Sequence, residues 1–373
     1  MKTALLFMLL FALHLESYSI EITGRITDVE TGNPVEYTAV YINGSTIGTT
    51  TDTLGRFSLA YNFDHCRIVI NHVSYKSAVL DISPEVHRNL DIKLEPKNIE
   101  MTQVLVQSQN LRKKSMAYFK KNFLGNNFWG ENAEILNDSV LFFHTEYFGA
   151  DAPDSALVGK RRYFVVQATA PLLIDLPKLG YLLQYDMVQF VEAYDSIYKQ
   201  SVIKNLGYTY FREYDDVSRL QELRFRRNRY KVYYHSVMHF VRSLYENKLE
   251  QNGYDVYVIT RDSNTTHYNL FYADSIDISF KNDEAAIMNL QGTELLIQYY
   301  TNNFKPINLE RYEGDDNWRI LAGMSPAAYS VLYIEKDTCI LRKDGTLPGG
   351  ELLFDGDIAD KRYGAILPSD FKP

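Results

Sequence analysis

Residues 24–57 decide the fold of the N-terminal part, and they read GRITDVETGNPVEYTAVYINGSTIGTTTDTLGRF. Apolar and polar residues alternate in short runs along this stretch, which is the side-chain period of a β-strand. Gly, Asn, Asp and Pro interrupt the runs at 31–34, 43–44 and 52–55, where they favour tight turns. The stretch therefore predicts short strands joined by turns.

The same pattern continues on both sides of this stretch. It begins at Ile20 and stops before Pro96, and it predicts about seven strands, at 20–26, 37–42, 49–52, 55–59, 67–73, 77–82 and 90–94. So many short strands at regular spacing are typical of an antiparallel sandwich. We therefore expect residues 20–96 to form a β-sandwich domain.

The order of these turn motifs closely resembles the carboxypeptidase-regulatory-like domain. The resemblance is carried by GRITD at 24–28, TGNPV at 31–35, AV at 39–40, GTTTD at 48–52 and GRF at 55–57, and it covers about a fifth of the chain. It implies a prealbumin-like sandwich, a module found beside zinc carboxypeptidases and at the N-termini of outer-membrane TonB-dependent transporters. The family's sandwich has no catalytic residues, so the resemblance assigns none here.

The first 19 residues have the features of a signal peptide. Lys2 supplies a positive charge, residues 4–13 are apolar, and Ser17 and Ser19 fit a cleavage site before Ile20; a buried N-terminal helix is the alternative. The apolar run is too short to span a bilayer comfortably, and no later stretch approaches the ~20 apolar residues of a membrane helix. We expect an exported protein that does not span a membrane, in the periplasm or associated with the outer membrane or cell surface.

Residues 100–373 predict a larger β-rich domain with a few helices, so the fold class is mainly β, with α+β character in the C-terminal part. Strands are expected at 101–106, 140–143, 162–168, 181–191, 208–214 and 254–260. A helix is expected near 112–124, with Met116, Phe119 and Phe123 on one face. A second is expected near 236–251, with Ser236 as N-cap and a buried stripe of Val237, Phe240, Val241 and Leu244.

This larger region carries a resemblance of its own. FKKNFLG at 119–125, ATAPL at 168–172, LGY at 179–181 and HFVRSL at 239–244 resemble the C-terminal part of exported carboxypeptidase-like-regulatory proteins from gram-negative bacteria. The resemblance implies an architecture and no particular chemistry.

The net charge and the aromatic content limit the classes of partner that we expect. The net charge of −8 argues against nucleic acid, because nucleic-acid binding depends on neutralising phosphates with Lys and Arg. The 29 Tyr and 20 Phe favour a β-rich chain first, and a sugar- or peptide-binding face second.

Cys66 and Cys339 are the two cysteines; we expect two isolated buried thiols, with pairing in an oxidising compartment left open.

The sequence lacks the zinc-ligand pattern of a zinc carboxypeptidase. Such enzymes bind zinc through a His and a Glu three residues on, plus a distant His, and none of the eight histidines has Glu at that position. No HExxH motif is present either. No cofactor is therefore predicted, and a hydrolase with a site assembled from dispersed residues stays as the alternative function.

A serine nucleophile pattern also occurs. Ser-x-x-Lys is present at 196–199 and 201–204, with Lys343-Asp344-Gly345 downstream, in the order of a penicillin-recognising enzyme. The downstream motif lacks the hydroxyl residue that such an enzyme needs, so the match is poor.

His235 and His239 are the candidate metal ligands. They lie four residues apart at the start of the expected helix, so both could point the same way and hold a metal if a third ligand came from elsewhere. They also lie off the apolar stripe, where solvated polar residues are expected. A solvated helix face is therefore the competing interpretation.

The densest basic stretch supplies the candidate binding residues, which are Arg224, Arg226, Arg227, Arg229 and Tyr230. An anionic glycan, a lipid headgroup or an acidic partner could dock there. The competing interpretation is a solvated strand-turn-strand with acidic neighbours such as Asp215, Asp216 and Glu222.

These observations favour a non-enzymatic envelope protein that binds a protein or glycan partner. The sandwich would be the docking or spacer module, and the Tyr-rich region the recognition module. The oligomeric state is not predicted.

Overall fold

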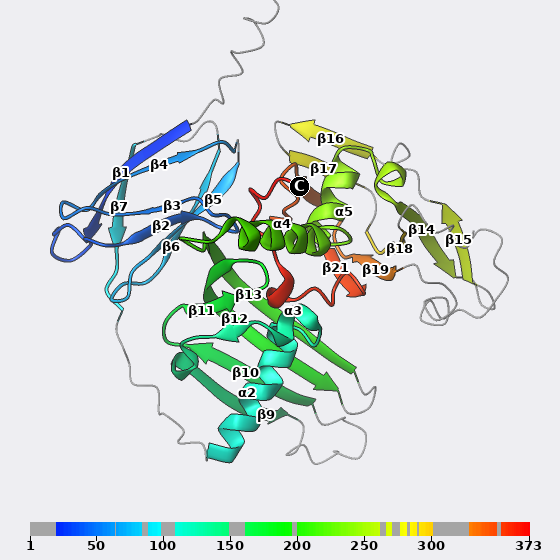
Figure 1. Ribbon diagram of the computed structural model, residues 1–373, viewed down its shortest axis with the longest axis horizontal. Helices are drawn as coiled ribbons and strands as arrows, with labels where there is room; N and C mark the ends of the chain where they lie inside the picture. The colour runs from blue at the N-terminus through cyan, green and yellow to red at the C-terminus, as the bar shows by residue number, and fades with distance from the viewer. Residues whose placement is uncertain are drawn as a thin grey trace, which may run out of the picture. The chain divides into compact units, whose positions relative to one another are not determined.

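The structure is a computed structural model (Figure 1). It describes residues 20–63, 65–83, 89–97, 109–148, 161–195, 200–261, 266–270, 277–281, 284–288, 291–300, 328–348 and 352–373. The predicted signal peptide at 1–19, the predicted strand at 101–106 and the Ser-x-x-Lys pattern at 196–199 lie outside these residues. Two compact units are present: 20–43 and 47–97 belong to the first, and 44–46 and the described residues from 109 onward belong to the second.

The first unit is a β-sandwich, as the sequence predicts. One sheet has the order β4-β1-β7 and the other β3-β2-β5-β6. The strands are β1 (Ile20–Asp28), β2 (Ala39–Ile42), β3 (Gly48–Thr50), β4 (Arg56–Tyr61), β5 (Cys66–Asn71), β6 (Ala78–Ile82) and β7 (Asn89–Leu94). The β1–β7 pair is parallel, whereas the other pairs in this unit are antiparallel. All seven predicted strands are therefore confirmed, and one pair departs from the antiparallel arrangement.

Two aspartates in the turn motifs explain why this sequence forms these turns. Asp28 accepts the backbone N–H of Thr31 at 2.8 Å and the hydroxyl of Tyr75 at 2.8 Å. Asp52 accepts the backbone N–H of Arg56 at 2.8 Å. Short carboxylate side chains satisfy the turn's own donors in this way, which is why Asp is common in turns. The turns thus form from local signals that are visible in the sequence.

Gly55 closes one of these turns against the core. Its φ is +71°, and a Cβ at this position would lie 2.4 Å from the carbonyl oxygen of Ile26. Both the left-handed backbone and the close approach require glycine. Beneath the turns, the inward faces of the two sheets bury a core that includes Ile26, Val40, Ile68 and Ile70, each 0% exposed.

The second unit contains a six-stranded sheet with a helix packed on one face (Figure 1). Its order is β8-β11-β12-β10-β9, with β13 paired to β12. The strands are β8 (Glu134–Ile135), β9 (Leu141–Phe148), β10 (Arg161–Ala168), β11 (Leu172–Leu176), β12 (Tyr181–Asp195) and β13 (Gln200–Glu213). The helix is α2 (Gln109–Phe123), which confirms the helix expected near 112–124; the short α3 (Phe128–Glu131) and the 3₁₀ turn η1 (Asp138–Val140) follow it.

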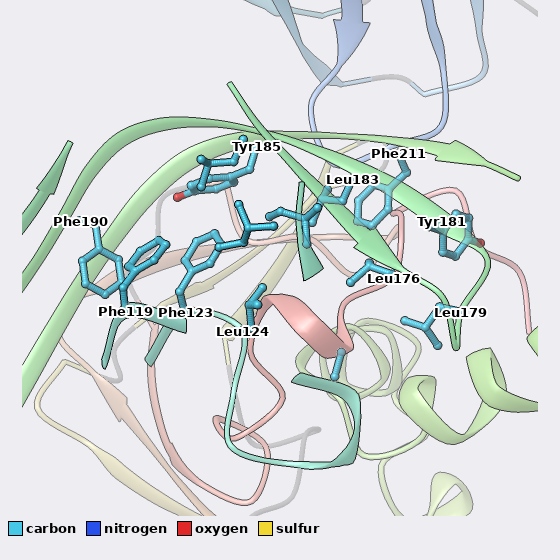
Figure 2. Packing of buried hydrophobic residues seen from close by; sticks show 14 of the residues in the cluster. Phe119, Phe123, Leu124, Leu176, Leu179, Tyr181, Leu183, Tyr185, Phe190 and Phe211 are labelled. Carbon is cyan, nitrogen blue, oxygen red and sulfur yellow. The ribbon is translucent and has the colours of Figure 1, made fainter. Parts of the chain in front are cut away.

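Aromatic side chains fill the space between α2 and this sheet. Phe119 and Phe123 of α2 are each 0% exposed. The Phe119 ring lies 5.0 Å from that of Phe190, and the Phe123 ring lies 5.0 Å from that of Tyr185 (Figure 2). Edge and tilted contacts at these distances are favourable beyond the area that they bury. Much of the aromatic excess in this unit is therefore core.

Two further sheets complete the second unit. Their orders are β15-β14-β18-β19-β21 and β16-β17-β20. The strands are β14 (Tyr254–Arg261), β15 (Thr266–Leu270), β16 (Asp277–Lys281), β17 (Glu284–Met288), β18 (Glu294–Tyr299), β19 (Ala328–Ile334), β20 (Thr338–Arg342) and β21 (Leu352–Gly356), and a 3₁₀ turn η5 (Tyr363–Ala365) lies near the end of the chain. The strands predicted from residue 140 to 260 are all present, some of them longer than expected.

The helix expected at 236–251 is shorter than predicted. α5 covers Val237–Tyr245, and a separate 3₁₀ turn, η2, covers Glu250–Asn252. Asn247 has φ +54°, a left-handed conformation that ends an α-helix. The predicted stripe is correct, because Phe240, Val241 and Leu244 are buried in a core shared with the neighbouring sheets.

Two smaller expectations also concern the fold. Across the described residues, no helix is both long and apolar enough to cross a membrane. Cys66 and Cys339 are each a free, buried thiol, and whether they pair in an oxidising compartment stays open.

Candidate functional site

The basic stretch at 224–231 forms a helix, so its interpretation as strand-turn-strand is wrong. α4 spans Arg219–Tyr233 and is drawn in green in Figure 1. Ser218 caps it: its Oγ accepts the N–H of Gln221 at 3.4 Å, and the Gln221 side chain accepts the N–H of Ser218 at 2.9 Å. This reciprocal pair is a capping box. The Ser-x-x-Gln signal and a run of good helix formers, Arg, Gln, Glu, Leu and Lys, outweigh the strand preference of the interspersed aromatics.

One edge of α4 is bonded to the sheet through Arg229. Its Nε donates to the carbonyl of Leu179 at 2.9 Å, and its Nη1 donates to the carboxylate of Glu213 at 2.8 Å. Its guanidinium also lies 3.9 Å from the centre of the Tyr181 ring. Of the predicted binding residues, Arg229 is therefore occupied in holding the helix in place.

Gly180 allows the same edge of α4 to pack closely against the turn between β11 and β12. Its φ is +70°, and a Cβ there would lie 2.4 Å from the ring of Phe225 in α4. A side chain at this position would push the helix away from the β11–β12 turn. The Leu179-Gly180-Tyr181 motif thus forms the surface against which α4 packs.

The opposite side of α4 is exposed and basic. Its exposed residues are Arg219, Leu220, Gln221, Glu222, Leu223, Arg224, Arg226, Arg227 and Lys231. The helix carries six cations and a single anion, Glu222, in a chain whose net charge is −8. In the part of the chain that the structure describes, Arg224 and Arg227 form no ion pair. We call Arg219, Leu220, Leu223, Arg224, Arg226, Arg227 and Lys231 the outward face.

Arg226 and Tyr230 contact each other one helical turn apart. Arg226 Nη2 donates to the Tyr230 hydroxyl at 3.3 Å, and its guanidinium lies 5.7 Å from the centre of the ring. The hydrogen bond, as its largest cause, raises the pKa of Arg226, which therefore stays charged. Of the predicted set, Arg224, Arg226 and Arg227 are available on the outward face, with Tyr230 half-buried beside them.

His235 and His239 lie at the junction between α4 and α5, and both are buried. Their exposures are 8% and 3%, so the expected solvated face is wrong. His235 precedes the helix, with φ +57°, and Ser236 caps α5 by accepting the N–H of His239 at 3.1 Å. The N-cap is thus confirmed. The histidines are buried because aromatic residues of α4, β14 and β18 cover the side of α5 that lies off its apolar stripe.

The two imidazoles are packed among tyrosines. The His235 ring stacks on that of Tyr299, with centroids 4.8 Å apart and planes 1° from parallel. His239 Nδ1 lies 2.8 Å from the Tyr254 hydroxyl and accepts the backbone N–H of His235 at 3.3 Å. A nitrogen that accepts this N–H carries no proton, so the tautomer protonated on Nε2 follows. His235 Nε2 is buried and has no hydrogen-bond partner in the described structure.

Burial keeps both histidines neutral at pH 7. Desolvation lowers the pKa of His235 to about 3 and that of His239 to about 4, and the positive charge of Lys361 acts in the same direction. Burial also lowers the pKa of Lys361, to about 8. Its ammonium donates to the carbonyl of Val232 at 3.0 Å and to that of Tyr234, at the end of α4. The junction is therefore a compact cationic and aromatic cluster that closes one end of α4.

The structure brings the histidine pair together, and the residues that it describes supply no third ligand. Among the described residues, no three His, Cys, Asp or Glu side chains gather closely enough to hold a metal ion. A metal at His235 and His239 would need a ligand from elsewhere and would displace the contact between His239 Nδ1 and Tyr254. Metal binding at this pair stays a prediction.

The second Ser-x-x-Lys pattern does not assemble a nucleophile. Ser201 and Lys204 both lie in β13, and residues three apart on a strand point to opposite faces. Ser201 Oγ instead donates to the carboxylate of Glu192 at 2.6 Å. The pattern requires a helix to bring its serine and lysine to one side.

Glu192 belongs to a polar network that no sequence pattern predicts. Its carboxylate is 1% exposed and accepts the hydroxyl of Tyr118 at 2.5 Å and Nη2 of Arg162 at 3.2 Å. The Arg162 guanidinium lies 5.8 Å from the Tyr118 ring and 5.3 Å from the Tyr194 ring. Desolvation, followed by the bond to Glu192, raises the pKa of Tyr118 to about 12. No local pattern in the sequence marks these residues, which meet only across α2 and three strands.

Comparison with known proteins identifies the N-terminal module. Residues 22–106 match the CarboxypepD_reg-like domain, which confirms the resemblance predicted for the N-terminal part. A search of curated proteins finds no match.

Two solved structures show limited similarity. A 9R-lipoxygenase from Cyanothece PCC8801 is 9% identical, with 61% of this chain and 49% of that one covered and a TM-score of 0.18. This chain thus spans about half the length of that lipoxygenase. A protein of unknown function from Bacteroides fragilis NCTC 9343 is 10% identical, with 51% and 98% covered and a TM-score of 0.18. At these TM-scores neither similarity bears on the fold or the activity of this chain.

Proposed function

We propose that this protein is exported to the cell envelope, where it lies in the periplasm or is associated with the outer membrane or cell surface and acts by binding rather than by catalysis. The signal-peptide features of residues 1–19 support export. The partner is an acidic protein or glycan. The CarboxypepD_reg-like sandwich serves as a docking or spacer module, and the second unit carries the recognition surface.

The outward face of α4 is the observation that carries this proposal. It gathers five exposed cations on one side of a helix, although the chain as a whole is acidic. A positive patch of this kind attracts an acidic partner and repels other copies of itself. The opposite edge of α4 is fixed by Arg229, so the patch is presented on a rigid element.

Affinity capture from envelope extract tests the proposal. The purified chain is used as bait at low and high salt, beside a variant with two outward cations reversed, Arg224→Glu/Arg227→Glu. A matched control, Lys113→Glu/Lys114→Glu, changes the net charge equally at exposed positions of α2. We expect an acidic protein or glycan that salt releases and that the α4 variant fails to retain, while the α2 control retains it.

The opposite results would count against the proposal. They are recovery of no component above background, or equal recovery by the wild type and the α4 variant. Circular dichroism of each variant confirms that α4 still forms, since Arg and Glu have similar helix propensity.

A further inference from the structure

The outward face of α4 has an apolar centre as well as charge. Leu220 and Leu223 are 69% and 55% exposed. Together with Arg227 they follow the i, i+3, i+7 spacing of one helical stripe. Arg224 and Lys231 lie on one flank of this stripe, and Arg219 and Arg226 lie on the other, as the 3.6-residue period requires. The pattern is therefore two exposed leucines with cations on both sides.

A purely polyanionic ligand would leave the leucines without a partner. A glycan or a free phosphate satisfies the cations, but it provides no apolar region for two large aliphatic side chains. A surface that presents anionic groups in a plane above an accessible apolar layer satisfies both the cations and the leucines. An anionic phospholipid bilayer has this arrangement, because leucines can reach the boundary between headgroups and acyl chains while arginines stay level with the phosphates.

The type and placement of the cations fit the same surface. Five of the six cations of α4 are arginine, whose planar guanidinium binds phosphate in a bidentate manner. One arginine, Arg229, holds the inner edge, so the helix can lie flat on a surface without leaving the sheet beneath it. The cations occur on both flanks of the leucines, as expected for contact with a plane.

We propose that α4 seats the protein on an anionic phospholipid surface as a peripheral, interfacial helix. This inference rests on the proposed function, because both require the outward face to be the binding surface; an anionic lipid surface is the occupant proposed for that face, and an acidic protein or glycan is the outcome if the vesicles do not bind. Leu220 and Leu223 insert, and Arg219, Arg224, Arg226, Arg227 and Lys231 contact the phosphates.

Vesicle co-sedimentation tests this proposal. The full chain is mixed with vesicles of phosphatidylcholine alone or of phosphatidylcholine with phosphatidylglycerol, at low and high salt. We expect binding only to the anionic vesicles. Arg224→Glu/Arg227→Glu should weaken it by at least about 25-fold, because each basic residue near an anionic surface contributes about fivefold and two are removed. Lys113→Glu/Lys114→Glu should leave it unchanged.

A second variant tests insertion apart from charge. Leu223→Cys is labelled with an environment-sensitive fluorophore, which is selective because Cys66 and Cys339 are buried. Insertion predicts a blue shift with anionic vesicles and none with phosphatidylcholine alone. Leu220→Gln/Leu223→Gln should leave some attraction at low salt and abolish binding at high salt.

Three outcomes would overturn the inference: no binding to anionic vesicles, equal loss in the α2 control, or binding without the spectral shift. If vesicles fail to bind while capture from envelope extract still depends on Arg224 and Arg227, the lipid occupant is wrong and the proposed function stands. If neither depends on these arginines, both proposals are wrong.

Discussion

Two consecutive helices of the second unit differ in how they are held. α4 has 15 residues, of which only Val232 and Tyr233 are buried. α5 has nine residues, of which five are buried. α5 is held by the core, whereas α4 depends on its cap, on its helix-forming residues and on one bonded edge. The difference shows that α5 is packed into the core and that α4 leaves a long side exposed.

The largest expected effect is on stability, and it comes from removing a buried side chain of α5 rather than an exposed one of α4. Phe240→Ala in α5 removes a ring that is 1% exposed and that lies 5.4 Å from the ring of Tyr254. We expect a loss of about 3–5 kcal/mol in the free energy of unfolding. Leu223→Ala in α4 should stay within about 0.5 kcal/mol, since its side chain is exposed. Urea unfolding followed by circular dichroism measures both, and similar losses would contradict the comparison.

The junction between the helices predicts a loss of stability in acid. The pKa values of His235 and His239 are lowered to about 3 and about 4 in the folded chain, against about 6.5 when unfolded. Between these values the unfolded chain binds more protons. Stability is therefore fully present above about pH 6.5 and falls as the pH drops towards 4. We expect a loss of about 2 kcal/mol per histidine near pH 5, measured by urea unfolding.

A double variant tests whether these groups cause the loss. His235→Asn/His239→Gln removes both titrating rings, and Asn tolerates the left-handed conformation of residue 235. The variant should be less stable at neutral pH and should lose much less stability on acidification. An unchanged dependence on pH would assign the acid sensitivity to other groups.

A smaller difference in stability is expected between substitutions on the bonded edge of α4 and on its outward face. Arg229→Ala removes the donors to the carbonyls of Leu179 and Gly180 and the cation over the Tyr181 ring. We expect a loss of about 1–3 kcal/mol. Arg227→Ala should change stability by no more than about 0.5 kcal/mol and should weaken binding to an acidic partner. Thermal unfolding checks the first difference and the capture experiment checks the second; a destabilised Arg227→Ala would show that the outward face also supports the fold.

The sequence predicted some of these features because their signals are local. The turn aspartates of the sandwich bond to backbone groups two to four residues away, so alternation and turn residues are enough to predict seven strands. The stripe and the N-cap of α5 were equally readable. The cap of α4 was present too, at Ser218 and Gln221, but the aromatics at 225 and 230 favoured the wrong secondary structure.

The candidate site was only partly predictable. A helical stripe identifies the face that meets one core, and it cannot reveal that a second element covers another face. The tyrosines at 254 and 299 come from β14 and β18, and they bury the histidines that the pattern placed in solvent. The roles of Arg227 and Arg229 likewise differ although they are two residues apart, because only the fold decides which one faces the sheet.

Local signals are enough to predict the sandwich, the mainly β class, the helix α2 and the position of the basic stretch, because each depends on propensity, periodicity or turn chemistry within a few residues. Tertiary structure decided that the basic stretch is a helix with one side exposed, that its arginines divide into anchors and available cations, and that His235 and His239 are buried and neutral. These properties arise from contacts between segments far apart in the chain. Burial and desolvation depend on the sum of such contacts, and no local pattern encodes that sum.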